Sequence, residues 1–155
     1  MLQSMWFWAA SGLVAVLVVS LVPGIGAFVL APLAAVVIGV LAAWYMRAPD
    51  GSTGRPTRAA VVAGLGAFLA SIIVLAGFGL ALGSNPAIQE LIRESEPHPE
   101  ARVPYEWMTG LGMATGALVG FGMGLFNFVL STVAGLLTAL FTSHKPSGSP
   151  QAAGG

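Results

Sequence analysis

The stretch AAVVAGLGAFLASIIVLAGFGLAL, residues 59–82, decides the fold of this chain. It contains no charged side chain, and Ser71 is its one hydroxyl residue. About 20 consecutive apolar residues let a helix cross a hydrocarbon core of about 30 Å. Membrane-spanning strands are shorter and alternate apolar with polar residues. This stretch is longer than such a strand and does not alternate. We therefore predict a transmembrane helix here.

Three further apolar stretches occur at residues 5–22, 25–46 and 107–141. The composition agrees, because 8% of the residues are charged where soluble domains average about 25%. So few charges cannot cover a water-facing surface. No lysine or arginine precedes the first stretch, so we interpret it as a retained span and not as a signal peptide. The sequence predicts an all-α integral membrane protein, a four-transmembrane-helix bundle within residues 1–142.

The connections between the stretches differ in character. Pro23 and Gly24 predict a tight turn, so the first two helices should form an antiparallel hairpin. A polar loop, residues 47–57, follows the second stretch, and a longer loop, residues 83–106, follows the third. Residues 143–155 are rich in proline, serine, glycine and alanine, which indicates a disordered tail.

The charges predict an orientation with both chain ends in the cytoplasm. Arginines crowd the 47–57 loop and Lys145 follows the fourth stretch, whereas the 83–106 loop is mostly acidic. Cytoplasmic loops carry the excess of basic residues. Aromatic residues typical of membrane interfaces lie at the ends of the stretches: Trp6, Trp8, Trp44, Tyr45, Tyr105 and Trp107.

Small residues recur at every fourth position and should let helices pack closely in lipid. The second stretch contains Ala35, Gly39 and Ala43, and the fourth contains the glycine row Gly112, Gly116, Gly120 and Gly124. We favour packing inside this bundle for the glycine row. The alternatives are an interface with another subunit or copy, and a pore lined by glycine backbone. The fourth stretch is also overlong, so its helix should protrude, tilt strongly or bend near its glycines, and we favour a protruding outer end.

Polar residues within the stretches are few, and none is charged. Asn127 is the strongest of them, and we expect its amide to bond across helices. Hydroxyl groups such as that of Ser71 can bond the preceding turn of their own helix. His98 and His144 lie outside the stretches, and the chain has no cysteine. We expect no metal site, no cofactor and no nucleic-acid partner.

Residues 86–95 of the long loop should form a short amphipathic helix, because Asn85 can cap it and Pro86 suits its first position. Ile88, Leu91 and Ile92 would share its apolar side. This side could lie on the outer membrane surface, cap the bundle or dock a partner, and we favour contact with a protein partner.

The overall pattern resembles that of small, glycine- and alanine-rich, four-span bacterial membrane proteins, which implies a multi-pass protein of the bacterial cytoplasmic membrane. We favour a non-catalytic accessory subunit of a larger membrane complex, such as a respiratory or photosynthetic assembly. Its partners would be the lipid bilayer and other subunits or a second copy. A self-assembling channel or small-solute carrier is the first alternative. A lipid-modifying enzyme using Arg102, Glu106 and the acidic loop is the second.

Overall fold

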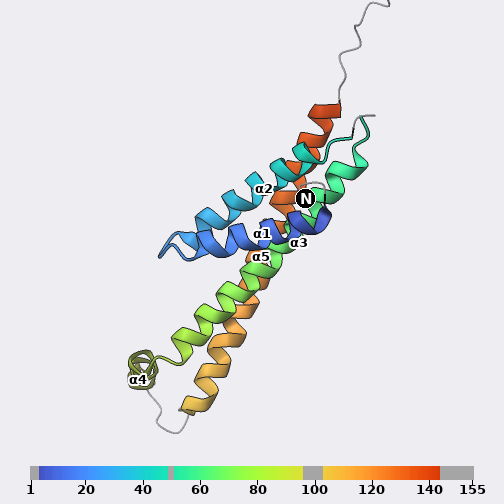
Figure 1. Cartoon of the computed structure of the whole chain (residues 1–155). Helices are drawn as coiled ribbons and strands as arrows, with labels where there is room; N and C mark the ends of the chain where they lie inside the picture. Colours follow the sequence, from blue (N-terminus) through green and yellow to red (C-terminus); the bar gives the residue numbers. More distant parts are fainter. Residues whose placement is uncertain (1–3, 49–50, 96–102, 144–155) are drawn as a thin grey trace, which may run out of the picture.

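A computed structural model describes residues 4–48, 51–95 and 103–143, and every element in that part of the chain is a helix. The elements are α1 (Met5–Ser20), the π-helix η1 (Gly26–Leu30), α2 (Ala31–Tyr45), α3 (Gly54–Gly83), α4 (Pro86–Ser95) and α5 (Tyr105–Ser143) (Figure 1). The predicted disordered tail, except for Ser143, and the segment around His98 lie outside the described residues.

Three helical segments are long and apolar enough to cross a membrane. They are Gly26–Tyr45, Gly54–Gly83 and Tyr105–Ser143. The fourth apolar helix, α1, has 16 residues and a length of about 24 Å at about 1.5 Å per residue. It is therefore shorter than a hydrocarbon core of about 30 Å.

Helix boundaries differ from the predicted spans for local reasons. α1 ends at Ser20, two residues earlier than expected, because Pro23 cannot donate a backbone hydrogen bond and Gly24 turns the chain with φ +80°. Before α2 the chain forms the π-helix η1, next to Pro32, which also lacks the donor that a regular helix needs. α3 begins at Gly54, earlier than the predicted Ala59.

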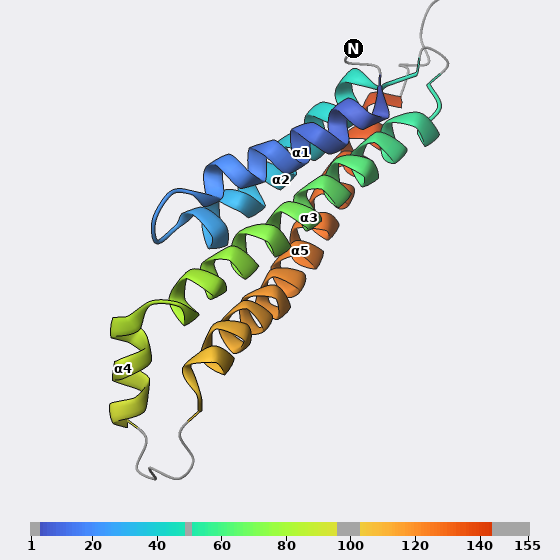
Figure 2. The ribbon, with the colours of Figure 1, turned by 60° about the horizontal axis from the view of Figure 1, so that its bottom comes forward.

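α5 is a single unbroken helix of 39 residues, about 58 Å long. Its glycines do not interrupt the helix. α5 pairs with α3 along most of the length of both helices, in antiparallel order, as Figures 1 and 2 show. The α1–α2 hairpin packs against the half of this pair that contains the start of α3. α4 lies across the opposite end.

The interior of the bundle is built from small side chains. One buried cluster joins Trp8 with Ala42, Met46, Ala59 and Ala63. A second cluster joins Val16 with alanines of α2 and α3. Large apolar side chains lie outside instead, such as Leu118 at 74% and Phe141 at 80% exposure. Large apolar groups outside and small groups inside suit a protein whose surroundings are lipid.

Candidate functional site: a glycine interface and an apolar groove

The glycine row of α5 faces α3 of the same chain. A Cβ atom added at Gly112 would lie 3.1 Å from the Cα of Gly83, and one at Gly120 would lie 2.8 Å from the carbonyl oxygen of Ser71. A Cβ atom at Gly124 would lie 2.7 Å from the carbonyl oxygen of Phe68. Since ordinary contacts of a Cβ atom begin near 3.4 Å, only glycine allows the two backbones to approach this closely.

Gly116 completes this interface, because a Cβ atom there would lie 2.9 Å from the carbonyl carbon of Leu75. All four glycines of the row therefore have a partner helix within the chain. Docking of another subunit on the row would require α3 to move away. A path lined by these glycines is likewise filled by α3 in this structure.

The small residues of α2 are also used inside the chain. Ala35 and Ala43 are buried. A Cβ atom at Gly39 would lie 2.9 Å from the carbonyl carbon of Ser131 on α5. Small residues on α2, α3 and α5 thus hold the hairpin onto the long pair.

Asn127 makes a buried polar contact between α5 and α3. Its Nδ2 donates to Ser71 Oγ at 2.9 Å, and Ser71 Oγ donates to the Ala67 carbonyl, also at 2.9 Å. Because the serine proton is directed at Ala67, Ser71 can only accept from Asn127. Asn127 Oδ1 has no hydrogen-bond partner among the described residues. The predicted bond across helices therefore has Ser71 as its acceptor.

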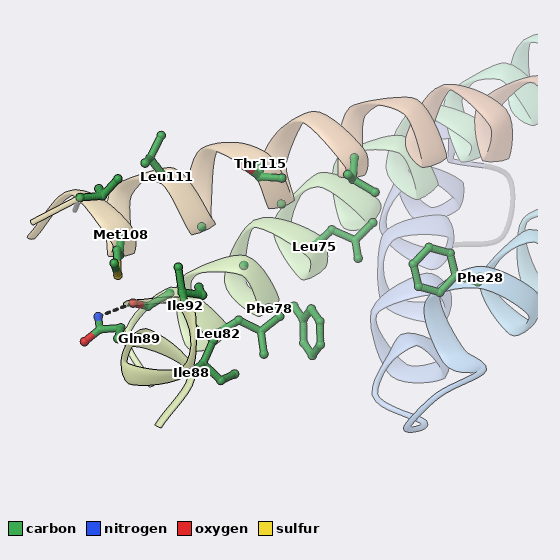
Figure 3. Close-up of a pocket in the computed structure, with 16 residues that line it drawn as sticks. Phe28, Leu75, Phe78, Leu82, Ile88, Gln89, Ile92, Met108, Leu111 and Thr115 are labelled. Carbon is green, nitrogen blue, oxygen red and sulfur yellow. Dashed lines mark hydrogen bonds between the residues drawn. The ribbon is translucent and has the colours of Figure 1, made fainter. Parts of the chain in front are cut away.

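An apolar groove lies where the hairpin ends and α4 crosses the α3–α5 pair. We call it the α4 groove; its volume is about 530 Å³. Figure 3 shows Phe78 of α3 facing the space between Phe28 of η1 and the isoleucines of α4. The lining residues are Phe28, Leu75, Phe78, Gly79, Leu82, Gly83, Ile88, Gln89, Ile92, Val103, Met108, Leu111, Gly112, Thr115, Gly116 and Val119.

Local hydrogen bonds fix α4 above the groove. The Asn85 side chain accepts from the Ala87 amide at 3.0 Å and caps the helix. Gln89 Nε2 donates to the Gly83 carbonyl at the end of α3. Tyr105 donates from its hydroxyl to Glu90 at 2.8 Å. The Arg93 guanidinium lies 4.4 Å from the centre of the Tyr105 ring. α4 is thereby connected to both long helices.

The three apolar residues predicted to share one side of α4 differ in their contact with the groove. Ile88 and Ile92 line the groove, whereas Leu91 does not and is 66% exposed. Sequence reasoning missed Phe28, Phe78 and Val119 as lining residues. No local signal marks them, because the groove depends on where the hairpin ends along α3.

The groove suits binding of an apolar molecule. Its side-chain polar groups are the Gln89 amide and the Thr115 hydroxyl, and Gln89 already bonds Gly83. No group of three or more histidines, aspartates or glutamates that could hold a metal ion occurs within residues 4–48, 51–95 and 103–143. The lining therefore supplies shape and apolar contact, with no acidic or basic side chain among the lining residues.

Three apolar helices long enough to cross a bilayer, packed through small residues, define an all-α membrane protein. Comparison with known proteins adds no closer relationship: no family model, curated protein or solved structure matches the chain.

Proposed function

We propose that the chain is a non-catalytic accessory subunit of a larger membrane complex. The observation that carries this proposal is that α4 is amphipathic and exposed. This helix has a strongly apolar and a strongly polar side, and none of its residues is buried. An amphipathic helix without a covering partner commonly docks its apolar side on a protein or membrane surface.

An exposed glycine at the start of α5 favours a protein partner next to α4. A Cβ atom added at Gly110 would meet nothing within 4 Å. This position faces away from α3 and lets a second helix approach the α5 backbone closely. Leu91, exposed on α4, would contribute apolar area beside this surface.

The proposed topology places both chain ends on the cytoplasmic side of a bacterial cytoplasmic membrane. Arg55 and Arg58, both exposed, lie at the start of α3. Arg47 at the end of α2 lies 5.1 Å from the ring of Trp44. The start of α1 and the end of α5 lie at this same end of the molecule (Figure 2). Basic and aromatic residues together favour this end for the cytoplasmic interface.

Site-specific photo-crosslinking in native membranes tests the accessory role. A photoreactive amino acid replaces Leu91 in one variant and Leu137 in a control. Leu137 is also exposed but lies toward the opposite end of α5. We expect a discrete adduct with one other membrane protein from position 91, and lipid adducts alone from position 137. Lipid adducts alone at both positions, with a protein that migrates as a lone monomer in mild detergent, would refute the accessory role.

A further inference from the structure

The α4 groove lies at the depth of the hydrocarbon layer. Residues 59–83 contain no charged side chain and measure about 37 Å as a helix, more than the core of about 30 Å. Leu75 to Gly83, which contribute the α3 wall of the groove, form the last third of this length. The groove is therefore surrounded by lipid chains, near the surface at which α4 lies.

The hairpin ends before it reaches that surface. α1 is about 24 Å long, and its turn, Leu21–Ile25, contains no polar side chain. Three of the four backbone amides in the turn are paired: Leu21 donates to Val18 at 3.3 Å, Val22 to Val19 at 3.2 Å and Ile25 to Pro23 at 3.0 Å. Pro23 has no amide to satisfy, which leaves the Gly24 amide as the one donor of the turn without a partner among the described residues. Because most of its amides are paired, the turn tolerates a position inside the bilayer better than an open loop would.

Because the hairpin ends before it reaches the surface at which α4 lies, it limits which molecule can occupy the groove. Phe28 bounds the groove on the hairpin side, and Ile88 and Ile92 bound it on the α4 side (Figure 3). A helix of another protein entering from the α4 side would have to stop near Phe28. Its last backbone groups would then lack partners in hydrocarbon. A lipid acyl chain has no such groups and naturally ends in the middle of the bilayer.

We propose that the α4 groove binds an acyl chain of a zwitterionic phospholipid from the leaflet on the α4 side. The groove volume, about 530 Å³, lies within the range of about 300–1,000 Å³ typical of small-molecule sites. This inference does not depend on the accessory role proposed above.

Charge near the groove selects the headgroup. Glu90 and Glu94 on α4 and Glu106 at the start of α5 are exposed, and the described part of these helices carries one arginine, Arg93. An acidic rim attracts the ammonium group of a zwitterionic lipid and repels an anionic headgroup.

Native mass spectrometry of the whole chain released from bilayers of equal phosphatidylethanolamine and phosphatidylglycerol content tests this inference. Val119→Trp places a large ring in the groove. Leu118→Trp is the matched control, because Leu118 is the 74% exposed neighbour that does not line the groove. We expect the native chain and the control to retain one phosphatidylethanolamine each. Retention by Val119→Trp should fall about tenfold, the effect of about 1.4 kcal/mol in binding.

Equal lipid retention by the two tryptophan variants would overturn the inference, as would retention of phosphatidylglycerol to the same or a greater extent. A second measurement needs no substitution. Phosphatidylethanolamine with a photoactivatable acyl chain should label Phe78 and Val119 even after exchange against excess plain lipid. Labels at Leu137 and Leu140, which are exposed at the other end of α5, should disappear in that exchange. If the labelled lipid exchanged at the same rate in the groove and at the other end of α5, the result would also count against the site.

Discussion

The close approach of α5 to α3 predicts that a glycine-to-alanine change destabilises the protein at one glycine of α5 and not at its neighbour two residues away. Gly120→Ala adds a Cβ atom 2.8 Å from both the Cα of Ile72 and the carbonyl oxygen of Ser71. Both atoms belong to the backbone of α3, so no change of rotamer can relieve the contact. Gly122→Ala adds the same atom where nothing lies within 4 Å.

The structure gives the size of the expected difference. Ordinary Cβ contacts begin near 3.4 Å, so α3 and α5 must separate by about half an ångström or more at Gly120. Overpacking of this kind costs about 1–3 kcal/mol. Alanine favours a helix over glycine by about 0.5–1 kcal/mol in water. We therefore expect Gly120→Ala to lower the free energy of unfolding by about 1–3 kcal/mol, and Gly122→Ala to leave it unchanged or slightly raised.

The assay is reversible unfolding in mixed micelles of mild detergent and dodecyl sulfate, followed by far-ultraviolet circular dichroism. Gly120→Val and Gly122→Val extend the series and should widen the gap, because a larger side chain deepens the contact at position 120 alone. Spin labels at Ile73 and Leu118, both exposed, would report the separation of the helices directly. If the two alanine variants unfold at the same dodecyl sulfate fraction, the proposed contact between α5 and α3 is wrong.

Three other contacts give further predictions. Ser71→Ala removes the acceptor of the Asn127 amide and should cost about 0.6 kcal/mol, the average for interhelical hydrogen bonds in membranes. A double-mutant cycle with Asn127→Leu should return the same coupling, and a coupling near zero would contradict the bond. Gly66→Ala places a Cβ atom 2.9 Å from the Leu13 amide nitrogen and should loosen the hairpin. The readout is the fluorescence of Trp8 in a background where it is the sole tryptophan. Gly66→Ala should shift this emission to the red. Gly77→Ala, where a Cβ atom would meet open space, should leave the emission unchanged. Tyr105→Phe removes the hydrogen bond to Glu90, which is worth about 0.5–1.5 kcal/mol. Backbone amides of α4 should therefore exchange with deuterium faster, while those of α3 keep their protection. Unchanged exchange in α4 would show that the bond does not hold the helix.

Single-helix features could be read from the sequence because they depend on neighbouring residues. The apolar run at residues 59–82 predicts a spanning helix, and α3 contains it completely. Asn85 and Pro86 mark the start of α4 through side-chain capping and a fixed φ angle, which are local effects. The helix that packs against the glycine row could not be identified in this way. A row of glycines indicates close packing, but the spacing is the same whether the opposing helix is α3 or belongs to another protein.

The α4 groove could not be predicted because it arises from a mismatch in helix lengths. α5 exceeds the expected span at both ends, whereas α1 stops at Ser20. The consequence is that the α1–α2 hairpin lies beside the part of the α3–α5 pair that contains the start of α3 and ends before it reaches α4 (Figure 2). The overlong fourth stretch indicates this difference in the sequence, and protrusion of its helix stays a prediction. How much of α3 and α5 the hairpin leaves uncovered depends on the position of the Pro23–Gly24 turn along these helices. Packing of the hairpin against α3 sets that position. Because a bilayer leaves no empty volume beside a protein, that position also determines how far a lipid chain can follow α3 and α5 into the molecule.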